Sequence, residues 1–312
     1  MESWQVIEHG KPLQKVLTET PQPRGTEVLV RITRSGVCHS DLHIWDGYFD
    51  WGGGKRFYVK DRGCVPPFTL GHEPFGMVAA LGPRAKGVKV GQKRIVFPWI
   101  GCGKCSMCRD GLDNYCAAMR TVGVLRPGAY ATHLLIPHPK YLVDAGGLDE
   151  AFAATLACSG VTAYSAVSKL PKLGARDWVA VLGCGGVGLA AVSVLKARGV
   201  RNVIACDLDE SKLAAARTLG AKKTLDTQVP DAQKLQELAG GQLAAAIDFV
   251  GMPATHALAY PALRKGGRYI LCGLFGGEIT LPMPPIAQRA VAMMGSYVGN
   301  LQELKAVVAL AK

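Results

Sequence analysis

The stretch WVAVLGCGGVG, residues 178–188, decides the fold of the second half of this 312-residue chain. Its apolar start predicts a buried strand over 178–182, and the spacing G-x-G-x-x-G then opens a helix that runs to about Arg198. In such a turn the first glycine permits the bend, the second lets the backbone approach a pyrophosphate, and the third lets helix and strand pack closely. The predicted cofactor contacts of this loop are Gly183, Gly185, Gly186, Val187 and Gly188.

A carboxylate follows at the end of the next predicted strand, residues 202–207. Asp207 lies nineteen residues after Gly188. An acidic side chain at that place accepts hydrogen bonds from the adenosine ribose and repels a 2′-phosphate, which favours NAD over NADP. The alternative is a helix-capping aspartate beside surface glycines; the strand–turn–helix context favours the cofactor site.

The chain changes character near residue 146. Beyond it, strands alternate with alanine-rich helices, which is typical of βαβ units on a parallel sheet; the further elements expected are a helix over 210–219 and strands over 245–250 and 268–274. Before it, short β-rich runs between Gly/Pro turns predict an irregular, mostly-β domain, with strands over 27–33, 76–81, 93–97 and 128–135. The expected fold class is α/β, with a mostly-β domain over 1–146 and a doubly wound parallel-sheet domain over 147–298. Residues 299–312 are expected to begin a helix that leads back to the first domain.

Four cysteines stand within fifteen residues, in the spacing C-x2-C-x2-C-x7-C: Cys102, Cys105, Cys108 and Cys116. One short lobe can turn four thiolates toward a single point, as a tetrahedral structural zinc site requires, and Gly101, Gly103 and Gly111 supply the tight backbone. A disulfide pair or incidental thiols are the alternatives. An iron–sulfur cluster also uses four thiolates, but its usual spacings differ.

Composition narrows the function classes. The chain is 49% hydrophobic and 19% charged, which is ordinary for a globular enzyme. Its net charge of +12 is scattered without a basic-aromatic stripe, so we expect an anionic cofactor and no nucleic acid as partner. We see no apolar run near the ~20 residues of a membrane span and no signal peptide, so we expect no membrane partner and a cytoplasmic location, where the ten cysteines stay reduced.

A second set of metal-ligating residues is dispersed along the chain: Cys38, His72 and Cys158. Each alone is typical of a core position. Together they form a donor set suited to zinc, and three protein ligands leave the fourth position open, as catalysis requires. The four-cysteine lobe and the glycine loop favour this second interpretation.

These motifs together resemble the zinc-containing medium-chain alcohol dehydrogenases, which combine a GroES-like catalytic domain with a Rossmann domain. The resemblance covers nearly every residue from about 5 to 312. It rests on C-H-S-D-L-H at 38–43, G-H-E at 71–73, the cysteine lobe at 102–116, A-C-S-G-V-T at 157–162 and G-C-G-G-V-G at 183–188.

The resemblance implies roles for individual residues. Cys38, His72 and Cys158 would hold a catalytic zinc, with Glu73 beside it and Asp41 orienting the His72 ring. Ser40 and His43 would relay the substrate proton to solvent. The remaining implied cofactor contacts are His39 at the pyrophosphate, Thr162 at the nicotinamide end, Lys212 at the adenosine ribose, and Leu274.

The implied activity is the reversible, zinc-dependent oxidation of primary or secondary alcohols to aldehydes or ketones with NAD. The alternatives are a polyol dehydrogenase, an NADPH-preferring aldehyde reductase, a catalytically silent cofactor-binding member, and a nucleic-acid-binding zinc protein. Cys158 argues against the polyol type, whose third ligand is usually Glu, and Asp207 argues against NADPH. The resemblance also implies a homo-oligomer, a dimer or a tetramer, joined through the cofactor-domain sheets near 268–274 and 295–298.

Two features depart from the family pattern. The segment between Cys38 and His72 is about a dozen residues longer than is usual in the family, and it contains a Gly-rich, basic insertion at 50–63. One hypothesis is that this insertion helps to admit an anionic or bulky substrate through Lys55, Arg56, Lys60 or Arg62. The alternative is that it packs on the surface or on a neighbouring subunit. Trp45, Tyr48 and Trp99 are candidate pocket-wall aromatics. The chain also ends at Lys312, within a helix starting near Leu301, where family members continue; we expect reduced stability for a chain of this length.

Overall fold

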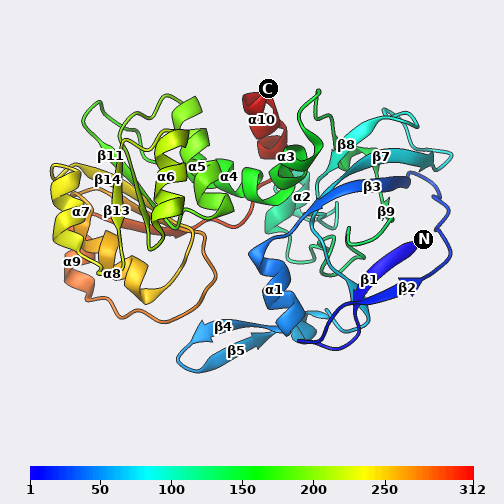
Figure 1. The fold of residues 1–312 in the computed structure, drawn as a ribbon, viewed down its shortest axis with the longest axis horizontal. Helices are drawn as coiled ribbons and strands as arrows, with labels where there is room; N and C mark the ends of the chain where they lie inside the picture. Colours follow the sequence, from blue (N-terminus) through cyan, green and yellow to red (C-terminus); the bar gives the residue numbers. More distant parts are fainter. The chain divides into compact units, whose positions relative to one another are not determined.

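The computed structural model describes all 312 residues, which form two compact units (Figure 1). The first unit comprises Met1–Phe49, Phe57–Val161 and Gly299–Lys312. The second comprises Asp50–Arg56 and Thr162–Val298.

The second unit is built on a six-stranded parallel sheet with the strand order β13-β12-β11-β14-β15-β16. Its strands are β11 (Trp178–Leu182), β12 (Val203–Asp207), β13 (Lys223–Asp226), β14 (Leu243–Asp248), β15 (Arg268–Leu271) and β16 (Ala292–Gly295). Its helices are α4 (Val161–Ser168), α5 (Gly186–Ala197), α6 (Glu210–Leu219), α7 (Ala232–Leu238), α8 (Pro253–Ala262) and α9 (Met283–Arg289). The sheet starts at a middle strand and winds outward in both directions, which confirms the predicted doubly wound arrangement.

Helices cover both faces of this sheet: α5 packs beside α6 on one face and α7 beside α8 on the other (Figure 1). Strands covered on both faces read as continuous apolar runs rather than alternating ones. Accordingly, all six residues of β14 are buried, and two of them, Leu243 and Ala246, share one core cluster with Leu182, Ile204 and Tyr269.

The first unit is mostly β. A five-stranded antiparallel sheet has the order β10-β8-β7-β3-β9, and a three-stranded sheet has the order β2-β1-β6. β4 pairs with β5 in a hairpin whose residues Asp50–Arg56 belong to the second unit. The strands are β1 (Glu2–Val6), β2 (Gln14–Leu17), β3 (Val28–Gly36), β4 (Tyr48–Gly52), β5 (Lys55–Tyr58), β6 (Phe68–Thr69), β7 (Glu73–Leu81), β8 (Lys93–Val96), β9 (His133–Ile136) and β10 (Leu142–Val143). The helices are α1 (His39–Asp46), α2 (Ser106–Arg109), α3 (Glu150–Thr155) and α10 (Leu301–Ala311), with single 3₁₀ turns at Val59–Arg62, Asp113–Tyr115 and Pro139–Tyr141.

Two strands differ from their predicted bounds for a visible reason. β9 begins at His133 rather than at residue 128, because the amides of Gly128, Ala129 and Tyr130 donate to carbonyls of the segment 69–71 instead of to a sheet. β14 ends at Asp248 rather than at residue 250, because the Asp248 side chain accepts the amides of the next residues and turns the chain.

The units also divide the chain later than the composition change at residue 146. Residues 147–161 lie in the first unit. Glu150 of α3 explains this, since it accepts a hydrogen bond from Thr33 Oγ1 at 2.9 Å and pairs with Lys93 Nζ at 2.6 Å, both on the five-stranded sheet.

One segment, Glu150–Ser168, is long and apolar enough by length and composition to cross a membrane, contrary to the expectation that no run approaches this length. Within its most apolar window 61% is buried inside the fold. The core helix of a soluble protein meets the same criteria, so this segment is weak evidence for a span.

Asp248 is a fully buried carboxylate that organises the end of β14. It accepts hydrogen bonds from Val250 N at 2.8 Å, Gly251 N at 2.9 Å and Thr255 Oγ1 at 2.7 Å, and a further one from the Tyr269 hydroxyl. Four donors therefore depend on one side chain, and a buried donor without a partner is costly.

We predict that Asp248→Ala lowers the free energy of unfolding by about 3–5 kcal/mol, because the amides of Val250 and Gly251 and the Tyr269 hydroxyl lose their acceptor. Thr255 Oγ1 still has the Met252 carbonyl at 2.9 Å. Tyr269→Phe is expected to lower the free energy of unfolding by about 1–2 kcal/mol. Urea unfolding followed by circular dichroism measures both. Glu237→Gln, on exposed α7, is the matched control and is expected to change stability by less than about 0.5 kcal/mol. An Asp248→Ala loss as small as that of the control would contradict the prediction.

Candidate metal and cofactor sites

Cys38, His72 and Cys158 converge in the first unit. Their ligand atoms all lie within 4.8 Å of one another, and the two sulfurs are 3.9 Å apart. Since a disulfide needs about 2.05 Å, these are separate thiols. The predicted trio is thus brought to one point from three distant parts of the chain.

Local backbone structure places each member. Cys38 is the N-cap residue of α1. His72 follows Gly71, whose φ of +98° is a left-handed conformation that glycine tolerates, and precedes β7. Cys158 lies in a π-helical turn, Leu156–Gly160, between α3 and α4; such turns are frequent at functional sites.

Asp41 binds two of the three ligand segments together. Its Oδ1 accepts from His72 Nδ1 at 3.0 Å and from Gly71 N at 3.4 Å, and its Oδ2 accepts from Cys38 N at 3.1 Å and from the Tyr130 hydroxyl at 3.1 Å. The bond to Nδ1 leaves His72 Nε2 as the atom available to a metal, and it fixes the tautomer and the ring orientation.

Glu73 connects the third segment. Its Oε1 accepts from Ser159 N at 3.0 Å and from Ser159 Oγ at 2.7 Å, and Ser159 is the neighbour of Cys158. Burial raises the pKa of Glu73 to about 7, although the Ser159 hydrogen bonds oppose the shift. Sequence reasoning did not identify Ser159 as part of the site, although its place directly after a predicted ligand was a usable signal.

The donor set suits zinc. His72 Nε2 is buried, has no hydrogen-bond partner and lies beside the two thiols. Two sulfurs and one imidazole nitrogen form a ligand set that occurs in catalytic zinc sites. The hydrogen bond from the Cys158 thiol lowers the pKa of Cys38 to about 4, so one sulfur is already a thiolate near neutral pH. Burial disfavours the charged imidazole, but the hydrogen bond with Asp41 and the negative charges of Asp41 and Cys38 outweigh it and raise the pKa of His72 to about 10; a metal therefore displaces a proton from this ring.

The four cysteines of the lobe also converge. Cys102, Cys105, Cys108 and Cys116 place their sulfurs within 4.8 Å of one another, with closest separations of 3.7 and 4.0 Å. All four are free thiols, which rules out the disulfide alternative in this structure. Gly103 and Gly111 have positive φ, and a Cβ on Gly101 would meet the Cys108 sulfur at 2.4 Å, so the lobe needs these glycines. Four thiols around one point form a closed site, as structural zinc requires.

The glycine loop of the second unit has room for a pyrophosphate. A Cβ on Gly188 would lie 1.8 Å from the Gly183 carbonyl oxygen, and Gly183 itself has a φ of +83°, so both are required by the backbone. Gly185 and Gly186 face open space at the N-terminus of α5. That combination lets an anion approach the helix amides closely.

Asp207 lies beside this loop at the carboxyl end of β12. Its Oδ2 accepts from Cys184 N at 2.6 Å, its Oδ1 accepts from Asp209 N at 3.1 Å, and Lys212 Nζ is 3.9 Å away. The predicted loop glycines, Asp207 and Lys212 therefore form one group. No reported contact joins Thr162 or Leu274 to it; Thr162 Oγ1 is buried without a partner, and Leu274 is half exposed.

Ser40 and His43 lie three residues apart on α1, and therefore on one face of the helix. The His43 ring packs against His39 at 4.9 Å and Phe49 at 4.8 Å between centroids. Burial, followed by the charge of His39, lowers the pKa of His43 below its ordinary 6.5.

The insertion forms the β4–β5 hairpin, and its basic side chains have local partners. Lys55 lies 3.8 Å from Glu278, Lys60 lies over the Tyr58 ring and Arg62 over the Phe57 ring. Of the candidate wall aromatics, Trp45 packs on a core cluster. Trp99 donates to the Ala157 carbonyl and its ring lies 5.6 Å from that of His72, next to the metal ligands.

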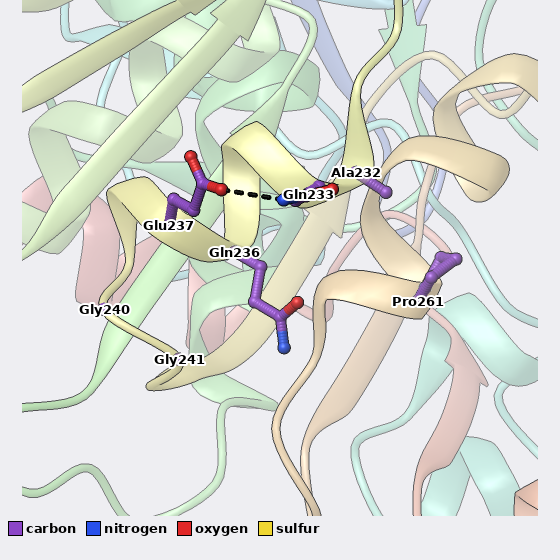
Figure 2. Close-up of a pocket in the computed structure, with 7 residues that line it drawn as sticks. All are labelled: Ala232, Gln233, Gln236, Glu237, Gly240, Gly241 and Pro261. Atoms are coloured by element: carbon purple, nitrogen blue, oxygen red, sulfur yellow. Dashed lines mark hydrogen bonds between the residues drawn. The ribbon is translucent and has the colours of Figure 1, made fainter.

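Figure 2 shows a different hollow, of about 610 Å³, between the end of α7 and α8. Its polar groups are few: Gln233 donates to Glu237 at 3.0 Å, and Gln236 is the other amide. Gly240 and Gly241 precede β14, so the hollow lies at the amino edge of the parallel sheet, whereas the glycine loop lies at the carboxyl edge. None of its lining residues belongs to the glycine loop or to either metal cluster.

Comparison with known proteins agrees with this geometry. Residues 24–145 match the family described as alcohol dehydrogenase GroES-like domain, and residues 186–312 match zinc-binding dehydrogenase. The chain is 35% identical to an NAD-dependent alcohol dehydrogenase of Sulfurisphaera tokodaii, over 100% of this chain and 89% of that protein, and 34% identical to one of Saccharolobus solfataricus with the same coverage. The crystal structure of the alcohol dehydrogenase of Aeropyrum pernix superposes with a TM-score of 0.89 at 32% identity, covering 100% of this chain and 89% of the other.

The matches to the two halves confirm the expected GroES-like and Rossmann fold class, and full-length identity above 30% extends over both metal clusters and the glycine loop. The chain belongs to the zinc-containing medium-chain alcohol dehydrogenase family.

Proposed function

We propose that this chain catalyses the reversible oxidation of primary or secondary alcohols to aldehydes or ketones with NAD. The convergence of Cys38, His72 and Cys158 carries the proposal, because three protein ligands leave the fourth zinc position open to a substrate oxygen. The NAD-dependent alcohol dehydrogenases among its relatives support the same activity.

In this proposal the trio holds a catalytic zinc and the four-cysteine lobe holds a structural one. The catalytic ion supplies a Lewis acid that polarises the substrate oxygen. Asp41 keeps the His72 ring in its ligating orientation through Nδ1. Glu73 provides a nearby carboxylate, which Ser159 holds through two hydrogen bonds.

Proton transfer is assigned to α1. The Ser40 hydroxyl would accept the proton of the substrate alcohol while it releases its own through the ribose hydroxyl to His43, which would pass a proton on to solvent. The lowered pKa of His43 keeps the imidazole neutral at neutral pH, so it can accept that proton.

Cofactor contacts are assigned to the glycine loop and its neighbours. The loop Gly183–Gly188 presents backbone amides to the pyrophosphate, and Asp207 with Lys212 faces the adenosine ribose. His39, Thr162 and Leu274 are proposed to complete the contacts. The unpartnered hydroxyl of Thr162 supports a polar ligand there.

The competing activities differ in testable ways. A polyol dehydrogenase is disfavoured by Cys158 as third ligand, and an NADPH-dependent reductase by the carboxylate of Asp207. Assembly as a homo-oligomer follows only from the resemblance, a cytoplasmic location follows only from the sequence, and both stay predictions. A panel of straight-chain, branched and aromatic alcohols, run with NAD and NADP, ranks the substrates.

Replacing a zinc ligand tests the metal site. We predict that Cys38→Ser lowers the bound zinc from two ions per chain to one and lowers kcat about a thousandfold or more, because the polarising charge is lost. Metal analysis and NADH formation on the same sample measure both effects. Cys64→Ala, a buried thiol outside both clusters, is expected to keep two zinc ions and most of the activity. Two zinc ions in Cys38→Ser would refute the ligand assignment.

Asp207→Asn tests the cofactor assignment. The amide no longer attracts the ribose hydroxyls or repels a 2′-phosphate, so kcat/KM for NAD is expected to fall about tenfold, mainly through KM, while that for NADP rises. Steady-state kinetics with both cofactors measure the ratio. Asp226→Asn, at the same end of neighbouring β13, is the control and should leave the ratio unchanged. An unchanged ratio in Asp207→Asn would argue against a role at the ribose.

His43→Gln tests the proton path. In the unchanged protein, alcohol oxidation should weaken as the pH falls through the lowered pKa of His43, below 6.5, because the protonated ring cannot accept a proton. The variant should lose about tenfold or more in kcat at pH 7 and lose this acidic limb. His133→Gln, whose pKa is also lowered by burial, is the control. If both variants keep the limb, the relay lies elsewhere.

A further inference from the structure

Tyr130 is connected to the Cys38–His72–Cys158 cluster through Asp41. Its hydroxyl donates to Asp41 Oδ2 at 3.1 Å, on the carboxylate whose other oxygen accepts from His72 Nδ1 at 3.0 Å. Tyr130 and His72 are the two side chains that bond this buried carboxylate; the other two donors are the amides of Cys38 and Gly71. The chain of contacts therefore runs from tyrosine to aspartate to the zinc-ligating histidine.

The backbone holds Tyr130 firmly in this place. The amides of Gly128, Ala129 and Tyr130 donate to the carbonyls of Thr69, Gly71 and Leu70, each at 2.9 Å. The ring lies against Gly71, where a Cβ would meet it at 2.7 Å. Tyr130 is thus packed on the segment that carries His72.

The ring and the hydroxyl have separable roles. The ring packs on a core cluster that includes Val6, Ile44 and Leu70, which is a stability role. The hydroxyl adds a directional bond to a carboxylate that would otherwise keep a single donor on Oδ2. Burial and then the negative charge of Asp41 raise the pKa of Tyr130, so the hydroxyl remains a donor.

We propose that Tyr130 is a positioning residue of the catalytic zinc site: its hydroxyl fixes the rotation of the Asp41 carboxylate, which in turn aims His72 Nε2 at the metal. The proposal rests on the proposed function, since it assumes a zinc ion on Cys38, His72 and Cys158. Partners of a ligating histidine change metal affinity about 10–100-fold. A residue one step further out should act in the same direction and more weakly.

The chain offers a matched control at its other metal cluster. The Tyr141 hydroxyl donates to Asp113 Oδ1 at 3.2 Å, and Asp113 also accepts from Gly101 N, next to Cys102 of the lobe. Tyr130→Phe and Tyr141→Phe therefore remove the same kind of bond from the same unit, each behind a different cluster. Both keep the ring and its packing.

Zinc release to an excess of a chromogenic chelator tests the proposal. Protein loaded with two zinc ions per chain should release them in two phases, and Cys38→Ser identifies the catalytic one by its loss. Tyr130→Phe is expected to accelerate the catalytic phase about tenfold and leave the lobe phase unchanged. Tyr141→Phe is expected to leave the catalytic phase unchanged. In combination with Asp41→Asn, Tyr130→Phe should add less than its own single effect, because it acts through Asp41.

Three outcomes would overturn the proposal: a catalytic phase in Tyr130→Phe within twofold of the unchanged protein, equal acceleration of both phases, or full additivity with Asp41→Asn. Failure of the proposed function looks different. Two zinc ions without alcohol turnover would refute the activity while the release rates still decide the role of Tyr130. Absence of the catalytic phase from the unchanged protein would refute both.

Discussion

Two buried carboxylates hold together the three chain segments that meet at the catalytic cluster. Asp41 accepts hydrogen bonds from the Cys38 amide and from His72, and Glu73 accepts two from Ser159, beside Cys158. Residues 38, 72 and 158 are far apart in sequence, so closing these loops is entropically unfavourable. The carboxylates offset that cost through bonds to the Cys38 amide, to His72 Nδ1 and to Ser159, and the ligand atoms themselves remain available.

In the candidate cofactor site, too, one carboxylate has two roles. Asp207 is predicted to bind the adenosine ribose. In the structure it also accepts a hydrogen bond from the Cys184 amide, inside the glycine loop. The same carboxylate therefore connects β12 to the turn after β11, and the loop conformation depends on it. Gly183 and Gly188 complete the arrangement, because the carbonyl of one occupies the space where a Cβ of the other would stand.

Sequence reasoning succeeded where a residue type was demanded by backbone or ligand chemistry. The glycine loop, the cysteine lobe and the Cys-His-Cys trio all appear where their spacing or resemblance placed them. It failed where a single side chain controlled the backbone: β14 was placed two residues late because nothing in the pattern reveals that Asp248 captures the following amides. Likewise 128–130 looked like a strand, although its amides bond to the segment 69–71. Tyr130 lies in none of the quoted motifs, and Ser159 lies in one without a role assigned to it; the contacts of both appear only in three dimensions.

The buried carboxylates beside the two metal clusters share one electrostatic feature, the type of their hydrogen-bond donors. The hydrogen bonds to Asp41 and Glu73 come from amides, hydroxyls and His72, not from lysine or arginine, and Asp113 behind the lobe accepts from Gly101 N and Tyr141. A cationic side chain would satisfy a buried carboxylate more strongly, but it would also cancel the negative charge that attracts a divalent ion. Amide and hydroxyl donors orient a carboxylate without adding a positive charge of their own. Although the chain has a net charge of +12, the hydrogen bonds to these three carboxylates thus come without a lysine or arginine donor.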